Sequence, residues 1–262
     1  IALRLAVADA ERRIKLDPPL SVSYGQAQSD AGPVGTNTAH WVSAENVDGR
    51  LGMAYINQGA GELKYSQAVF SDGVLSSWNT EQLIDIASND CSLAIVSGYP
   101  AIAYFNQGLW FARAVDAAAS DFGDPVFVNE GAINDRAGIS NYMTYFNDNP
   151  YIVCADSSGN PNGGDIWTNR ALDPFGEVWP YLFKAHADGE AEGRAPSAVD
   201  TSNSPVVIFQ DDAAGGGSNV YMMRALDPFG DFMNLKEDVV IGEDAVLSED
   251  NSLLLYLSLI HI

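Results

Sequence analysis

The chain is 262 residues long and 47% hydrophobic, which is enough apolar material to bury a sizeable core. Its 35 acidic and 13 basic side chains give a formal net charge of −22, a negative field that repels nucleic acid and anionic membrane surfaces. No apolar run reaches the ~18 residues of a membrane-spanning helix, so we expect neither nucleic acid nor membrane insertion.

In chain order, the sequence shows one short unit that recurs about every 50 residues. One strand of this unit ends in a polar residue and recurs at Met53–Asn57, Ile102–Asn106, Ile152–Asp156 and Val207–Asp211. The strand after it recurs at Leu63–Val69, Leu109–Val115, Ile166–Leu172 and Val220–Leu226. A unit of this length cannot bury its faces alone, so we expect the copies to stack on one another.

Each unit is expected to contain four antiparallel strands, because period-two alternation and turn residues divide it four times. The clearest copy has them at Ser197–Asp200, Pro205–Gln210, Asn219–Leu226 and Asn234–Ile241. The third strand twice runs into LDPFG, at Leu172–Gly176 and Leu226–Gly230, where Asp-Pro-Phe-Gly is typical of a type I turn. The pattern predicts an all-β fold, a β-propeller of four-stranded antiparallel blades, with a β-solenoid as the main alternative.

The units predict a single β-propeller domain over residues 1–257, with about five blades. Complete blades cover approximately 39–85, 89–130, 138–185 and 195–241, and a partial blade combines 1–22 with 244–257. The two half-units either close the ring with strands from both termini or are the cut ends of a longer propeller. Residues 258–262 are interpreted as a non-native tail, because YLSLIHI (256–262) resembles a translated sequencing adapter of a metagenomic reading frame.

Two segments, SDGVLSSW (Ser71–Trp78) and DPFGEVW (Asp173–Trp179), resemble the Asp-box motif of sialidase-like propellers, S-x-D-x-G-x-T-W. In that family the motif forms the turn between the third and fourth strands of a blade, so the resemblance implies the same place here. Both segments depart from the motif in the spacing between Asp and Gly, so the resemblance implies a shared fold rather than a shared activity. The arginine motif of sialidases, Arg-Ile-Pro early in the chain, is missing.

Two sets of conspicuous side chains are expected to be structural. Arg113, Arg170 and Arg224 recur at one position of the unit, each three residues before an aspartate. We expect them to bind turn carbonyls or a carboxylate of the next blade. Cys91 and Cys154 occupy non-equivalent positions in adjacent units, so we expect two buried thiols rather than a disulfide.

Function should lie where the units differ, in the loops after their second and fourth strands, which share one face of a propeller. Asn57, Asn106, Asp156 and Asp211 begin the loops after the second strands, and we predict that they form a ring of ligand-binding oxygen atoms. Such a ring recognises sugar hydroxyls or a cation such as Ca²⁺; no other cofactor is expected. The alternative is that these residues cap the strand ends through their own backbone.

The sequence therefore favours a non-catalytic β-propeller binding module that recognises a glycan or a protein through its loops. We expect a monomer that is extracellular, at a cell surface or on a virion. No catalytic residue is assigned, because G-x-S-x-G, Walker-type and H-E-x-x-H motifs are all absent. The alternative is a glycoside hydrolase or sialidase-like enzyme that uses loop carboxylates, such as those of Lys184–Ala195.

Overall fold

The computed structural model describes residues 39–71, 74–79, 82–87, 89–128, 137–156, 164–186, 193–200, 205–213, 217–226 and 237–238. The chain divides into two compact units, Ile1–Gly32 and Pro33–Ile262, and the described residues all belong to the second. The predicted partial blade, the tail, the second Asp-Pro-Phe-Gly turn and most of Lys184–Ala195 lie outside the described residues. Within the described ranges, no helix is long and apolar enough to cross a membrane.

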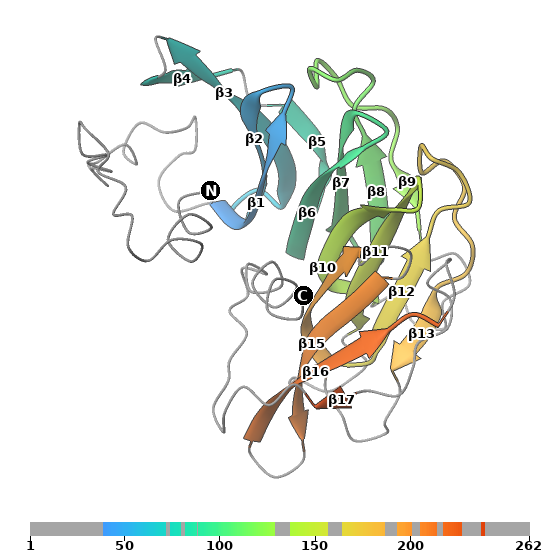
Figure 1. Cartoon of the computed structure of the whole chain (residues 1–262). Coiled ribbons are helices and arrows are strands. Elements are labelled where there is room, and N and C mark those ends of the chain that lie inside the picture. Colours follow the sequence, from blue (N-terminus) through green and yellow to red (C-terminus); the bar gives the residue numbers. More distant parts are fainter. Residues whose placement is uncertain are drawn as a thin grey trace, which may run out of the picture. The chain divides into compact units, whose positions relative to one another are not determined.

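The described strands form four antiparallel sheets that follow one another along the chain (Figure 1). The first contains β1 (Ala39–Val47), β2 (Arg50–Asn57), β3 (Glu62–Ser71), β4 (Val74–Trp78) and β5 (Gln82–Ile86). The second contains β6 (Asn89–Val96), β7 (Tyr99–Phe105), β8 (Leu109–Arg113) and β9 (Val126–Phe127). The third contains β10 (Ala137–Phe146), β11 (Asn149–Asp156), β12 (Ile166–Arg170) and β13 (Phe183–His186). The fourth contains β14 (Gly193–Asp200), β15 (Pro205–Ala213), β16 (Gly217–Arg224) and β17 (Glu237–Asp238).

Strands pair in chain order within each sheet, which confirms the predicted all-β propeller of four-stranded antiparallel blades. The first sheet differs, because one half of β3 pairs with β5 and the other half pairs with β4. Segment Ser71–Trp78, predicted to be a turn, therefore contains an additional strand. Its pairing with β3 runs from Ser71↔Val74 to Ala68↔Trp78, as in a tight hairpin.

The second predicted turn, Asp173–Trp179, does connect the third and fourth strands of its sheet. The Asp173 carboxylate accepts hydrogen bonds from the backbone N–H groups of Phe175 (2.8 Å) and Val178 (2.7 Å). Gly176 has a φ of 75°, which glycine adopts without steric cost. An aspartate that binds its own turn in this way fixes the loop without tertiary help.

The core lies between successive sheets, because each sheet is apolar on both faces. Strand β11 is buried along its whole length, and β7 is buried from Pro100 to Phe105. One cluster joins the first and second sheets and includes Leu63 and Tyr104; the next joins the second and third and includes Phe111 and Ile152. A third cluster joins the last two sheets. One repeated unit cannot bury both of its faces alone, and stacking the sheets buries them.

The first strands of successive sheets, β1, β6, β10 and β14, contact one another in order (Figure 1). Two serines connect them at equivalent positions. Ser43 Oγ accepts a hydrogen bond from Leu93 N, and Ser92 Oγ accepts one from Met143 N, each at 2.9 Å. These N–H groups belong to strands with no further strand on that side, so the serines satisfy donors that would otherwise lack partners.

Candidate functional site

All four first strands carry a β-bulge near their beginning, and in β1, β6 and β10 the bulge contains a non-glycine residue in the left-handed region. Trp41, Asp90 and Ser140 have φ values of 46°, 48° and 50°. The register of β1, β6 and β10 shifts at these residues. Positive φ is uncommon outside glycine and is an outlier for a residue as large as tryptophan. Bulges of this kind redirect side chains and concentrate beside active sites.

The bulges of β1 and β6 are joined directly, since Cys91 Sγ donates a hydrogen bond to Trp41 O at 2.8 Å. Burial raises the pKa of the Cys91 thiol, and the neighbouring Asp90 carboxylate raises it further. Burial, followed by Asp156 and Asp90, likewise raises the pKa of Cys154. Both cysteines are buried and free, as predicted, and both stay protonated. The negative charges of Asp90 and Asp156 are thus among the causes of the raised Cys154 pKa.

Asp156, one of the four predicted ring residues, ends β11 and is only 2% exposed. Its carboxylate accepts a hydrogen bond from Trp167 Nε1 at 3.0 Å, and its backbone N–H donates to Asp165 O at 3.0 Å. Gly164 passes so close that a Cβ there would overlap the Asp156 carbonyl and carboxylate oxygens. The side chain is therefore held inside the protein rather than presented to solvent.

The other predicted ring residues, Asn57, Asn106 and Asp211, lie at the same end of their sheets. Register shows this, because β1 begins opposite Asn57 and β14 begins opposite Asp211. The Asn57 carbonyl accepts from Gly61 N at 2.8 Å, and the Asn106 carbonyl accepts from Trp110 Nε1 at 2.9 Å. These are backbone contacts of the kind that the capping alternative predicts. Ligand binding by the ring remains a prediction.

Two further side chains, Glu45 of β1 and Tyr142 of β10, were missed by sequence reasoning. Burial raises the pKa of Tyr142, and the negative charge of Glu45 raises it further, so the phenol stays protonated and can donate a hydrogen bond. Their strands belong to the first and third sheets, and both strands contact β6. The sequence did contain one signal for Tyr142, a break in the repeat. The residue two positions after the left-handed residue is serine in β1 (Ser43) and β6 (Ser92) but tyrosine in β10.

Within the described ranges, no group of three or more His, Cys, Asp and Glu side chains could hold a metal ion. No protein-family model and no curated protein matches the sequence. Solved structures do resemble the fold. The chain is similar to an endo-1,4-β-xylanase from Bacteroides thetaiotaomicron, with a TM-score of 0.55, 13% identity, and coverage of 85% of this chain and 81% of that chain.

It is also similar to a Penicillium chrysogenum α-L-arabinanase complexed with arabinobiose, with a TM-score of 0.55 and 10% identity over 82% of this chain and 70% of that chain. A thermostable family-43 glycoside hydrolase gives a TM-score of 0.52 and 10% identity over 85% of this chain and 84% of that chain. Family-43 enzymes are five-bladed β-propellers, so the resemblance to sialidase-like proteins holds at the level of the propeller class.

These comparisons correct the main functional prediction. A non-catalytic binding module was favoured because the sequence lacks a recognisable catalytic motif, yet the similar structures are glycoside hydrolases, which supports the alternative instead. The reason is physical: two carboxylates on separate strands suffice for glycoside hydrolysis, and no fixed spacing in sequence marks them.

Proposed function

We propose that the protein is a glycoside hydrolase that uses Asp90 as a catalytic carboxylate at the bulged end of the first strands. The proposal is carried by the backbone of Asp90, an ionisable residue on a left-handed bulge beside Trp41 on a bulge of the same kind. Strained residues of this type concentrate at functional sites. The flat, partly exposed indole of Trp41 offers a surface on which the apolar face of a sugar ring can stack.

Hydrolysis of a glycosidic bond needs a second carboxylate, so that one acts as acid and the other as base or nucleophile. Glu45 of β1 is not that carboxylate, because it pairs with Gly52 next to the Asp48–Gly49 turn, at the other end of β1 from the Trp41 bulge. Asp156 is too buried to touch a substrate and contributes through its charge. Tyr142, whose pKa is raised by burial, donates a hydrogen bond to the substrate.

The substrate class proposed is a pentose polysaccharide of the arabinan or xylan type. Support comes from the names of the similar structures, an arabinanase and a xylanase, and from a site that combines carboxylates with an aromatic ring. A polymer of this kind is met outside the cell, so the expected extracellular location fits this proposal.

The test is Asp90→Asn, with release of reducing sugar measured on a panel of arabinan, xylan and arabinoxylan. General acid–base catalysis contributes about 10²–10⁴-fold, so the variant should lose at least about 100-fold in activity without a change in melting temperature. Asp48→Asn is the matched control, because Asp48 also has a positive φ of 50° and lies in the turn at the other end of β1. A parent protein inactive on the whole panel, or an Asp90→Asn variant as active as the parent, overturns the proposal.

A further inference from the structure

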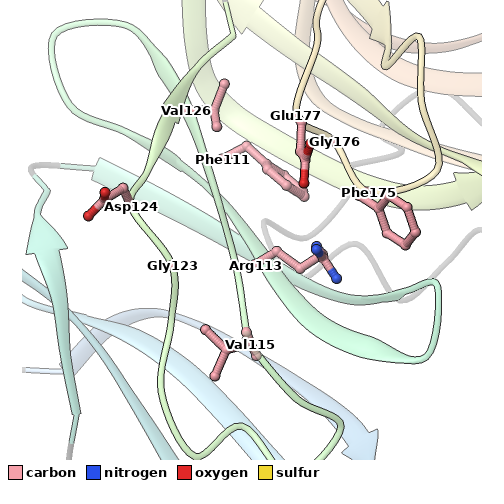
Figure 2. A pocket seen from close by; sticks show the side chains of 10 residues that line it. Phe111, Arg113, Val115, Gly123, Asp124, Val126, Phe175, Gly176 and Glu177 are labelled. Atoms are coloured by element: carbon pink, nitrogen blue, oxygen red, sulfur yellow. The ribbon is translucent and has the colours of Figure 1, made fainter.

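A pocket of about 230 Å³ lies at the other end of the second sheet from the bulges (Figure 2). The register fixes its position: Phe105 pairs with Asn89 and Leu109 at the bulged end, whereas Arg113 pairs with Ala101 at the opposite end. One wall is the end of β8 with the segment that follows it, and the other is the turn of the third sheet around Phe175. The pocket is therefore separate from the Asp90 site.

The pocket is a preformed feature, because the turn that forms its second wall is fixed to the second sheet. Gly176 approaches the Phe111 ring so closely that a Cβ would lie 2.5 Å from a ring carbon. Ser97 Oγ donates a hydrogen bond to Pro174 O at 2.7 Å, and Trp179 Nε1 donates to Gly176 O at 2.8 Å. A wall held by hydrogen bonds and ring packing needs little rearrangement to receive a ligand.

Arg113 is the unusual member of this pocket. Its guanidinium lies over the rings of Tyr99 (5.1 Å) and Phe175 (4.9 Å), and Figure 2 shows it directed toward Phe175. At the same repeat position, Arg170 donates to the carbonyl of Asn147 at 2.7 Å, as predicted from the sequence. The prediction is wrong for Arg113, since among the described residues no acceptor takes a hydrogen bond from its side chain. Its donors are thus aligned by two rings and left available.

The remaining lining decides which chemistry fits. Glu177 adds a carboxylate to the single cation, whereas the Asp124 carboxylate is directed away from Arg113 and Phe175 (Figure 2), so the pocket does not favour a free anion. Donors from Arg113 and an acceptor from Glu177 together match a ligand rich in hydroxyl groups, which both donate and accept. Phe175 is 42% exposed and supplies an apolar face. A volume of 230 Å³ is below the about 300–1,000 Å³ of pockets for drug-sized ligands, so one sugar ring fits better than several.

We propose that this pocket is an accessory glycan-binding site that holds one neutral sugar residue of a polysaccharide chain. The sugar ring stacks on Phe175, Arg113 donates hydrogen bonds to its oxygen atoms, and Glu177 accepts from its hydroxyls. The identity of the polymer rests on the proposed function, because the pocket holds the same polysaccharide that is cleaved at the Asp90 site.

The experiment is affinity gel electrophoresis in gels that contain soluble arabinoxylan, in an Asp90→Asn background so that the polymer stays intact. Phe175→Ala removes the stacking face and should weaken binding roughly tenfold. Glu177→Gln removes a charged acceptor and should weaken it by a smaller factor. The matched control is Tyr181→Ala, because Tyr181 is an aromatic residue of the same connection that is 75% exposed and outside the pocket. Thermal melts report whether each variant is folded.

Failure of this inference can be told apart from failure of the proposed function. The accessory site is overturned if the gel retards the Phe175→Ala and Tyr181→Ala variants equally strongly. It is also overturned if the gel does not retard the Asp90→Asn protein at all. With Asp90 restored, Phe175→Ala should hydrolyse arabinotriose as fast as the parent, because a trisaccharide needs only the Asp90 end. Retardation that depends on Phe175, without hydrolysis of any substrate, keeps the accessory site and removes the glycoside hydrolase proposal.

Discussion

Replacing Gly176 by alanine tests whether the third sheet is fixed to the second through one close contact. The residue has a φ of 75°, and an added Cβ would lie 2.5 Å and 2.6 Å from two carbons of the buried Phe111 ring. A left-handed alanine costs about 1–2 kcal/mol. Overpacking against a buried ring adds about 1–3 kcal/mol. The total of roughly 2–5 kcal/mol is a large part of the ~5–15 kcal/mol that stabilises a typical domain.

The matched control separates these two contributions. Gly98 has a φ of 82°, and an added Cβ meets nothing within 4 Å, so Gly98→Ala carries only the conformational cost. Urea unfolding of both variants measures the difference, provided that the slope of free energy against denaturant is unchanged. If Gly176→Ala is no less stable than Gly98→Ala, the contact between Gly176 and Phe111 does not hold the sheets together.

Two further changes test the interior. Ser92→Ala leaves Met143 N–H without its acceptor and should cost about 1–3 kcal/mol in urea unfolding, whereas unchanged stability argues against the connection between the first strands. Burial raises the pKa of Tyr65 to about 12, and its hydroxyl has no hydrogen-bond partner among the described residues. A folded-state pKa above the unfolded value of 10 leaves stability intact below pH 10 and lowers it between pH 10 and 12. Between pH 10 and 12 the parent should lose roughly 2–3 kcal/mol of unfolding free energy through Tyr65, and Tyr65→Phe should not show this loss. The prediction is contradicted if the unfolding free energy changes by the same amount between pH 9 and pH 11.5 in the parent and the variant.

The strands were predictable because each has a local signature. Pro205 marks the start of β15 and Asp200 the end of β14, as expected from the polar turn between them. Strand β4 was missed because Ser71–Trp78 was interpreted through a resemblance to a turn motif rather than through its Asp-Gly pair, a common hairpin signal. The bulges have no local signature at all. A tryptophan at positive φ follows from how the first strands pack, which no neighbouring residue in sequence encodes.

The candidate site shows the same division. Asp156 was predicted from its place at the end of a strand, but its burial depends on Gly164 and on Trp167, which lies on the neighbouring strand. Asp90 was overlooked because it stands at the beginning of a unit, where the pattern is weakest. Only the folded strands place Asp90 beside Trp41, on a left-handed bulge that recurs in the first strands.

The repeat of serines after the bulges of the first strands is broken in the third sheet. Ser43 and Ser92 each satisfy a backbone donor of the next first strand, a contribution of about 1 kcal/mol apiece. Tyr142 occupies the same place after the bulge of β10, and a phenol cannot reproduce the short reach of a serine hydroxyl. Burial and the negative charge of Glu45 raise the pKa of Tyr142, and a hydrogen bond with Ser197 partly offsets them, so the phenol of this unit stays protonated. The other three units keep the serine, since Ser197 stands at the same register position of β14, so we attribute the tyrosine to the proposed site rather than to the stability of the sheet.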